Sequence, residues 1–346
     1  MDITIAVVAY NEEDNLPKVF ENIIEQSYPH EHVEVVLVDS MSEDGTRDLM
    51  RTFAVQNNEE FLNIQVIENP GKMQSCGWNR AIEAFTTEAL IRLDAHGSIP
   101  ADFVERNVKA LEEGEYVTGG ARPSITNGDS PWQEVLLTAE SSMFGSSAAS
   151  FRRGSAASPE REEEKSYVKS LFHGAYRREV FEKAGRFRED LGRTEDNEFH
   201  YRIRQNGFPL CMVPGIVSYQ KIRPDLRKMC HQKYANGYWV GLTSGVCPGC
   251  LSLYHFVPLA FVAGIIVTTI LAVCSHPLLA VLMWTVYGAL SVVMAVLAVR
   301  GQRKRAGHLL LPVLFLMLHV SYGVGTLVGI LQMPFWKRRH NSYESE

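Results

Sequence analysis

Apolar residues follow two different periods along the first part of the chain. Strand-length apolar runs predict β-strands at residues 3–10, 33–39, 64–67 and 90–94, each followed by a polar turn. Between these runs, apolar residues recur at helical spacing and predict helices from residue 16, over 47–56 and around 78–82. Strands that alternate with helices predict an α/β domain with a mostly parallel sheet covered on both faces.

The same patterns continue beyond residue 100. They predict a helix over 102–113, a strand over 116–120, and an amphipathic helix over 199–206 that Gly207 ends. Small and polar residues predict a loop at 154–165, and a solvated linker and a functional lid are both open interpretations of it.

The last third of the chain is dominated by uncharged apolar runs. They cover residues 256–274, 277–299 and 309–333, and each is long enough to cross a bilayer as a helix. Only Ser275 and His276 separate the first two runs, which predicts a tight hairpin. We therefore expect a soluble domain over 1–245 and a membrane region over 246–346.

Basic residues near the apolar runs bear on the orientation in the membrane. The positive-inside rule predicts that Arg300 and the cluster 303–305 lie in the cytoplasm, together with the soluble domain. The basic residues 337–339 follow the third run, and three full crossings would place them on the opposite side. Either the third run is re-entrant or interfacial, or the C-terminus breaks the rule. We expect a multi-pass protein of the cell membrane.

The net charge and the cysteine content of the chain limit the functions that it can have. The formal net charge of −6 gives no support for nucleic-acid binding. The six cysteines are scattered apart from the C-x-x-C pair of Cys247 and Cys250. This pair is a redox pair, half of a zinc site, or two reduced thiols near a membrane.

The strand at 90–94 ends in the most informative residues of the chain. Ligands of open α/β sheets bind just beyond the carboxyl ends of strands. Asp94 and His96 are two residues apart, so in an extended segment their side chains point the same way. Together they can hold a divalent cation, with diphosphate oxygens and water as the other ligands. An ordinary exit from a strand into a loop is the alternative.

Polar residues also follow the other predicted strands. Tyr10-Asn11-Glu12 lies where the base and ribose of a nucleotide would bind, and Asp39 can accept a hydrogen bond from a uracil N–H. Lys72 and Asn79 come from the next turn and helix, within reach of ribose or phosphate. Turn chemistry alone is the alternative for Asn11. No G-x-G-x-x-G follows the first strand, so a dinucleotide-binding site is excluded.

Taken together, four motifs resemble those of one enzyme family. They are Val8-Ala9-Tyr10-Asn11-Glu12, Val38-Asp39-Ser40, Leu93-Asp94-Ala95-His96 and Thr194-Glu195-Asp196. In order and spacing this set resembles the family-2 glycosyltransferases of the GT-A fold. The D-A-H form of the D-x-D motif and the C-terminal apolar runs resemble the succinoglycan-type exopolysaccharide glycosyltransferases.

The resemblance implies a Rossmann-like, mostly parallel GT-A sheet followed by transmembrane or re-entrant helices. It also implies an inverting hexosyltransferase that uses a nucleotide-diphosphate sugar, usually a UDP sugar, with Mg²⁺ or Mn²⁺. The expected acceptor is a lipid-linked saccharide of exopolysaccharide or cell-surface glycan biosynthesis. The candidate donor-binding residues are Ala9, Tyr10, Asn11, Glu12, Asp39, Ser40, Lys72, Asn79 and Asp94. Asp94 and His96 are the candidate metal ligands, Asp196 the candidate catalytic base, and Glu195 and Trp239 the acceptor-side candidates.

The chain departs from the family pattern in two places. His96 replaces the second acid of D-x-D, which leaves the identity of the metal open. The Q-x-x-R-W motif of processive synthases is absent, because Gln232 is followed by Lys-Tyr-Ala-Asn rather than by an Arg-Trp pair. We therefore expect addition of a single sugar. Trp239 could stack on an acceptor sugar or lie at the membrane interface.

Two further functions stay open. One is a polyprenyl-phosphate sugar transferase, whose acceptor is a lipid phosphate that needs little deprotonation. The other is a non-catalytic scaffold that binds a nucleotide sugar. Retention of Asp94, His96 and Asp196 together argues against a scaffold, because a binding protein needs no base.

Overall fold

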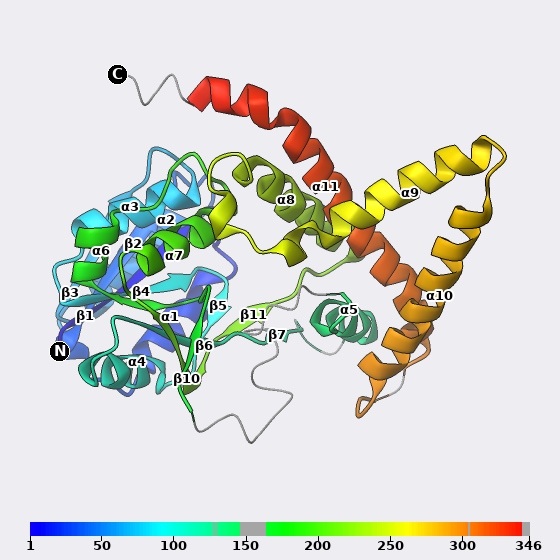
Figure 1. Cartoon of the computed structure of the whole chain (residues 1–346). Coiled ribbons are helices and arrows are strands. Elements are labelled where there is room, and N and C mark those ends of the chain that lie inside the picture. Colours follow the sequence, from blue (N-terminus) through cyan, green and yellow to red (C-terminus); the bar gives the residue numbers. More distant parts are fainter. Residues whose placement is uncertain (127, 129, 146–163, 304, 341–346) are drawn as a thin grey trace. The chain divides into compact units, whose positions relative to one another are not determined.

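A computed structural model describes residues 1–126, 128, 130–145, 164–303 and 305–340 (Figure 1). Most of the expected loop, residues 154–163, lies outside the described residues. The chain forms two compact units. The N-terminal unit comprises Met1–Pro123 and Phe151–Gln220, and the C-terminal unit comprises Ser124–Ser150 and Lys221–Glu346.

The N-terminal unit is built on an eight-stranded sheet with the order β3-β2-β1-β4-β9-β6-β10-β8. Its strands are β1 (Ile3–Ala9), β2 (Val33–Asp39), β3 (Asn63–Glu68), β4 (Ala89–Asp94), β6 (Val117–Ala121), β8 (Ser166–Val168), β9 (Ala175–Arg177) and β10 (Leu210–Val217). The first four strands pair in parallel, whereas β9 is antiparallel to both β4 and β6. The predicted mostly parallel sheet is confirmed. A short strand β5 (Gly97–Ser98) pairs antiparallel with β11 (Tyr219–Lys221).

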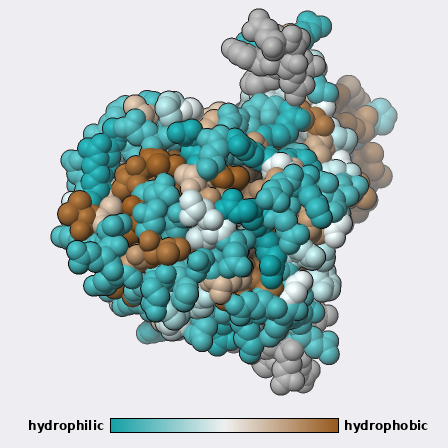
Figure 2. Space-filling view, turned by 90° about the vertical axis from the view of Figure 1, so that its left-hand side faces the viewer, coloured by the Kyte–Doolittle hydropathy of each residue, from teal (hydrophilic) through white to brown (hydrophobic). Residues whose placement is uncertain are grey.

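Helices cover both faces of this sheet, as the sequence pattern predicts. One face carries α1 (Leu16–Ile24), α2 (Thr46–Asn57) and α4 (Phe103–Glu112), and the other carries α3 (Gln74–Ala84), α6 (Arg178–Ala184) and α7 (Glu195–Gln205). Alternate strand residues point to opposite faces, so Ile5 joins the first core whereas Ala6 joins the second. Hydrophilic residues cover most of the face drawn in Figure 2.

The carboxyl ends of four strands are aligned, and this alignment positions the candidate site. In the register of the sheet, Ala9 lies beside Asp39, Asp39 beside Glu68, and Val8 beside Asp94. The strand order reverses between β1 and β4. In open α/β sheets, the carboxyl edge at such a reversal is where ligands bind.

Among its described residues, the C-terminal unit contains the short strand β7 and five α-helices. They are β7 (Ser124–Ile125), α5 (Pro131–Ser141), α8 (Leu226–Thr243), α9 (Val257–Val273), α10 (Leu278–Val299) and α11 (Leu311–His340). Three segments are long and apolar enough to cross a membrane: Leu253–Val273, Leu278–Val299 and Ala306–Arg339. The three predicted apolar helices are thus confirmed. In the turn between α9 and α10, Ser275 has a φ of 68°, as the predicted tight hairpin requires.

The third apolar segment is packed differently from the other two. Its most apolar window is 39% buried, against 6% and 11% for the first two segments. The backbones of α8 and α11 touch through glycines, since a Cβ at Gly325 would lie 2.1 Å from the carbonyl oxygen of Tyr234. A Cβ at Gly237 would lie 2.0 Å from the carbonyl oxygen of Tyr322. Small residues permit this close approach of two helices.

Packing assigns α5 and α8 to the same unit as the apolar helices, and that unit resumes at Lys221. The expected boundary near residue 245, between the soluble domain and the membrane region, stays a prediction. The connection between α10 and α11 is held to α5 by two polar contacts. Arg305 forms an ion pair with Glu134, and Thr138 donates a hydrogen bond to Gln302 over 2.8 Å.

Candidate active site

The loops that follow β1 and β2 are joined by hydrogen bonds. The side-chain oxygen of Asn11 accepts from the backbone N–H of Glu43 over 2.9 Å. The backbone N–H groups of Asn11 and Glu12 donate to the hydroxyls of Ser42 and Thr46 over 3.0 and 2.8 Å. The structure therefore brings the candidate residues after the first strand next to those after the second strand.

Asp39 is a buried carboxylate whose charge is compensated. It accepts from the backbone N–H of Ser42 over 3.1 Å and from Nε of Arg47 over 2.7 Å. Arg47 also forms an ion pair with Glu68 over 2.8 Å. Sequence reasoning assigned no role to Arg47, although its place in the first turn of the helix after the predicted base-binding acid was a usable signal.

Ser40 and Ala9 lie side by side at the ends of their strands. The backbone N–H of Ser40 donates to the carbonyl of Ala9 over 2.8 Å. The buried Ser40 hydroxyl accepts from the amide of Asn69 over 2.9 Å, and this amide also donates to the carbonyl of Met73. The turn that contains Lys72 is therefore anchored to the end of β2.

Several residues of these loops have a left-handed backbone. Among the described residues of the N-terminal unit, the non-glycine residues with positive φ are Asn11 (53°), Met41 (62°), Lys72 (58°) and His173 (46°). Such conformations are costly, and they gather at binding and catalytic sites where the surroundings enforce them. The first three follow β1, β2 and β3, at the edge where the strand ends line up.

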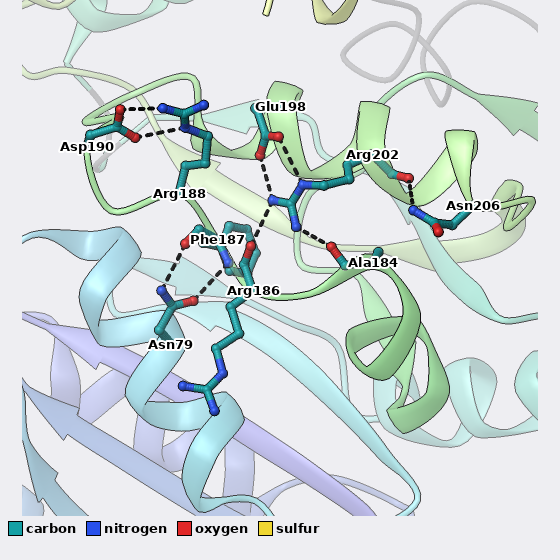
Figure 3. Close-up of polar contacts among 9 residues, drawn as sticks. All are labelled: Asn79, Ala184, Arg186, Phe187, Arg188, Asp190, Glu198, Arg202 and Asn206. Atoms are coloured by element: carbon teal, nitrogen blue, oxygen red, sulfur yellow. Dashed lines mark hydrogen bonds and ion pairs between the residues drawn. The ribbon is translucent and has the colours of Figure 1, made fainter. Parts of the chain in front are cut away.

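Asn79 has a structural role in this arrangement (Figure 3). Its amide donates to the carbonyl of Phe187 over 2.9 Å and accepts from the backbone N–H of Phe187 over 2.8 Å. The same amide donates to the carboxylate of Glu189 over 2.9 Å. Asn79 thus fixes the segment between α6 and α7, and its contact with the donor stays a prediction.

Helix α7 holds the same segment from the other side, as Figure 3 shows. Arg202 makes two hydrogen bonds to Glu198, of 2.9 and 2.6 Å, and donates to the carbonyl of Arg186 over 2.7 Å. The carboxylate of Glu198 is therefore engaged by a bidentate arginine. This pairing makes Glu198 a poor competitor of Asp196 for the role of base.

The metal-side candidates lie close to further ligating groups. An oxygen of Asp94 lies 3.2 Å from Nε2 of His173, and Nδ1 of His96 lies 3.4 Å from an oxygen of Glu12. Burial opposes ionisation of Asp94, but His173, His96 and Arg92 hold the pKa of this carboxyl well below its usual range. Asp94 is thus an ionised carboxylate at neutral pH.

Sequence reasoning missed His173. The imidazole is only 4% exposed, and neither ring nitrogen has a hydrogen-bond partner among the described residues. The ring lies against Gly97, where a Cβ would come within 2.8 Å of its Cε1. The described residues contain no group of three His, Cys, Asp or Glu side chains arranged around one point. An imidazole that lies 3.2 Å from an ionised carboxylate nevertheless fits a divalent cation whose other ligands come from a diphosphate.

The candidate base, Asp196, lies in the first turn of α7 and is paired with a buried arginine. Nη1 of Arg92 donates to Oδ1 of Asp196 over 2.5 Å. The guanidinium of Arg92 lies 4.4 Å from the ring centre of Trp78 and 4.6 Å from that of Phe187. Sequence reasoning missed Arg92 as well, although a charge inside an apolar strand, two residues before Asp94, was a signal.

Glu195 differs from its neighbour Asp196. The side chain is 4% exposed, and its Oε2 has no hydrogen-bond partner among the described residues. Burial, and then the charge of Asp196, raise the pKa of Glu195 to about 8. Glu195 therefore keeps its proton at neutral pH, and a protonated acid cannot accept another.

Two other candidates belong to the C-terminal unit. Trp239 packs edge-to-face on Trp336, with the ring centres 6.5 Å apart, and its contact with an acceptor stays a prediction. Cys247 and Cys250 form no disulfide in the described part of the chain. In the part of the chain that the structure describes, neither belongs to a group of metal-ligating side chains.

Two curated proteins resemble this chain over most of its length. The succinoglycan biosynthesis protein ExoA of Rhizobium meliloti (strain 1021) is 27% identical over 331 residues, which are 93% of this chain and 92% of ExoA. A dolichyl N-acetyl-alpha-D-glucosaminyl phosphate 3-beta-D-2,3-diacetamido-2,3-dideoxy-beta-D-glucuronosyltransferase of Methanococcus voltae is 25% identical over 247 residues, which are 69% of this chain and 73% of that protein.

Among solved structures, the mannosyltransferase PcManGT from Pyrobaculum calidifontis, in complex with GDP-Man and Mn²⁺, shares the fold with a TM-score of 0.62 at 18% identity. The match covers 94% of this chain and 86% of PcManGT. The family model "Glycosyl transferase family 2" matches residues 4–185, which include β1, β2 and the β4 strand end with Asp94. This match spans more than half of the 346 residues, and with it the chain belongs to glycosyl transferase family 2 and has the GT-A fold.

Proposed function

We propose that this membrane-associated glycosyltransferase is inverting and transfers one sugar from a nucleotide-diphosphate sugar to a lipid-linked saccharide. The favoured nucleotide is UDP, and the product belongs to exopolysaccharide or cell-surface glycan biosynthesis. One observation carries the proposal. An ionised carboxylate, Asp94, and a second carboxylate, Asp196, are both tied to the same strand, β4, the second of them through Arg92. Because the two acids lie in separate surroundings, one suits binding of the donor and the other suits deprotonation of the acceptor.

The residues around Asp196 support a role as general base. In a single displacement, the acceptor hydroxyl gives its proton to Asp196 while its oxygen bonds to the anomeric carbon. The bond from that carbon to the diphosphate breaks, and its electron pair leaves with the diphosphate. Arg92 donates to Oδ1 of Asp196, and this hydrogen bond leaves Oδ2 unengaged by the guanidinium. Oδ2 is therefore the oxygen available to take the proton.

Asp94, His96 and His173 are the residues that would hold a divalent cation on the donor side. A bound Mg²⁺ or Mn²⁺ supplies positive charge that offsets the charge of a departing diphosphate. The residues after β1 and β2, together with Asp39 at the end of β2, would hold the nucleoside. PcManGT was solved in complex with Mn²⁺, and this complex of a protein with the same fold supports the proposal of a metal here.

Transfer to a lipid-linked saccharide is favoured over transfer to a lipid phosphate by the two relatives that match more than two thirds of this chain. The Methanococcus voltae protein is named for a dolichyl-linked sugar phosphate as its acceptor, and ExoA for succinoglycan biosynthesis. We expect isolated membranes containing this chain to move labelled sugar from a UDP sugar to a lipid-linked saccharide. A screen of nucleotide sugars by thermal shift with Mg²⁺ or Mn²⁺ finds the donor first, because a ligand of the native state raises its stability.

Product analysis then decides between the three functions. Sugar joined to a lipid phosphate would favour the polyprenyl-phosphate sugar transferase. A nucleotide sugar that is bound but never consumed, across a panel of lipid-linked acceptors, would favour the scaffold. Membranes with the Asp196→Asn variant control for other transferases in the preparation.

We further propose that the catalytic domain faces the cytoplasm, where nucleotide sugars are made. The nine residues 122–130 that join β6 to α5 are mostly polar, so α5 lies on the same side of the membrane as the catalytic domain. Arg305 is paired with Glu134 of α5, which brings the end of α10 back to that side. The hairpin of α9 and α10 then crosses the membrane and returns.

The same reasoning applies to α11. Helix α8 follows β11 through a polar connection, and the C-terminal half of α11 is packed on α8. We therefore propose that α11 is re-entrant or interfacial, so that Arg305 and the basic residues 337–339 both lie in the cytoplasm. This arrangement obeys the positive-inside rule at both clusters.

Membrane fractionation and thiol labelling test this topology. We expect the full-length protein to stay in the membrane fraction after washing with alkaline carbonate. In intact cells, an impermeant thiol reagent should label the exposed Cys274 at the tip of the hairpin. A cysteine at Gln302 or Lys337, in a chain with Cys274 replaced by Ser, should react only after the cells are opened. Labelling of Lys337→Cys in intact cells would show that α11 spans the membrane.

A further inference from the structure

We propose that Arg92 is a positioning residue that fixes the orientation of Asp196 for proton transfer. This inference rests on the proposed role of Asp196 as the general base. Arg92 lies in β4 between Ile91 and Leu93, which belong to the core of the opposite face. Its side chain is therefore on the same face of the sheet as that of Asp94.

The contact between Arg92 and Asp196 joins two elements that are far apart in the sequence. The side chains of Arg92 and Asp196 are 8% and 19% exposed, and their polar atoms meet at 2.5 Å. A charge-assisted hydrogen bond of this length, shielded from water, holds a carboxylate far better than an exposed pair does. With Oδ1 engaged, the direction of Oδ2 is set by the guanidinium.

The position of Arg92 is itself fixed by its surroundings. The backbone N–H of Arg92 donates to the carbonyl of Gly174 over 3.0 Å. The guanidinium lies over the rings of both Trp78 and Phe187, which are 1% and 3% exposed. Phe187 is in turn held at both its backbone N–H and its carbonyl by Asn79. A series of contacts thus leads from α3 to the carboxylate of α7.

Asp94 on the same strand is ionised, whereas three other polar groups around this pair, His200, Tyr176 and Glu195, are neutral at neutral pH. Burial lowers the pKa of His200 to about 4, and its imidazole hydrogen-bonds the hydroxyl of Tyr176 over 2.8 Å. Burial also raises the pKa of the Tyr176 phenol, which therefore stays protonated. Glu195 likewise keeps its proton, because its pKa is raised to about 8. Arg92 is the cation that contacts Asp196 directly.

A guanidinium suits this position for a geometric reason. It is planar, stacks on aromatic faces and donates hydrogen bonds in its own plane at the same time. The ammonium of lysine keeps the charge but cannot be stacked between two rings while donating in a fixed direction. Methionine keeps part of the volume and removes both the charge and the donor.

Four variants of the full-length protein test the proposal: Arg92→Met, Arg92→Lys, Asp196→Asn and the double variant Arg92→Met/Asp196→Asn. The measured quantities are kcat, KM for the donor and Kd for UDP. A misplacement of about 1 Å at a reacting group costs roughly 100-fold in rate. We expect Arg92→Met to lower kcat by about that factor without a matching change in Kd, and Arg92→Lys to recover part of the loss.

The double variant distinguishes positioning from a general structural role. If Arg92 acts through Asp196, adding Arg92→Met to Asp196→Asn causes no further loss of kcat. Losses that multiply would overturn the proposal, and so would a normal kcat for Arg92→Met. If Arg92→Met does not fold, as thermal unfolding will show, Arg92→Lys decides alone: a normal kcat in that variant overturns the proposal.

Arg178→Met is the matched control. The guanidinium of Arg178 also lies over an aromatic ring, 4.0 Å from the ring centre of Phe85. Unlike Arg92, it donates its hydrogen bonds to the carbonyls of Phe85 and Thr87 rather than to an acid. An equal loss of kcat in this control would show that any stacked arginine is needed, against the proposal. Full activity of Asp196→Asn would instead refute the proposed base, whatever Arg92→Met does.

Discussion

Replacement of Asp196 by Asn is expected to slow sugar transfer by roughly 100- to 10,000-fold, while the affinity for the donor nucleotide persists. An amide cannot take a proton from the acceptor hydroxyl, which is a poor nucleophile while it stays protonated. The side chain keeps its shape, so the proposed donor site, which is built on strand ends rather than on α7, is unaffected. Transfer rate and UDP affinity, measured on the same preparation, check both parts of the expectation.

If Asp196 only stabilises the N-terminus of α7, a different result is expected. Acids in the first turn of a helix stabilise it through the helix dipole, and loss of a capping residue costs about 1 kcal/mol with activity nearly kept. The N-cap residue Thr194 makes no side-chain capping bond, and Asp196 bonds to Arg92 instead. Near-normal transfer by Asp196→Asn, with a lowered midpoint of thermal unfolding, would support the structural role.

Neighbouring acids provide the comparison for this variant. Glu195→Gln replaces an acid that is protonated in the folded protein, so the change in charge is small at neutral pH. Glu198→Gln removes the partner of Arg202, and its effect should appear mainly in stability. We expect the loss of rate in both variants to be smaller than in Asp196→Asn. A greater loss in either one would move the base to that residue.

Replacement of Asp94 by Asn should abolish metal-dependent binding of UDP and sugar transfer without unfolding the domain. Asp94 is ionised, lies at the strand end nearest His173 and His96, and offers the oxygen that Mg²⁺ and Mn²⁺ prefer. An amide oxygen is neutral and binds such a cation less strongly. In the unchanged protein, EDTA should therefore lower the affinity for UDP, and Mn²⁺ should restore it.

The control for this experiment is an acid outside the site. Asp102→Asn removes a carboxylate that pairs with Arg106 on the surface of α4, so the response of UDP affinity to EDTA should be unchanged. In Asp94→Asn, by contrast, affinity should be low and insensitive to EDTA. Equal affinity for UDP in EDTA and in Mn²⁺, in the unchanged protein, would contradict a metal at Asp94.

The local pattern of apolar residues was enough to predict the elements whose apolar runs are long and regular. The strand expected at 33–39 is observed as Val33–Asp39, because a run of apolar, mostly β-branched residues has no competing conformation once it is buried. The apolar run at 277–299 is observed as Leu278–Val299 for the same reason of length and uniformity. Parallel strands align their carboxyl ends, so the sequence pattern was also enough to predict that Asp94 lies beside the end of the first strand.

Short elements and distant contacts were decided by the tertiary structure. Strand β9 has only three residues, too few to show a period, and its place depends on pairing with β4 and β6. Arg92 and Asp196 are separated by 104 positions in the chain, and packing of α7 onto the sheet brings them together. His173 reaches Asp94 because Gly97 leaves room for its ring. Periodicity along a chain reports which residues become buried, but only the folded packing determines which buried charges meet.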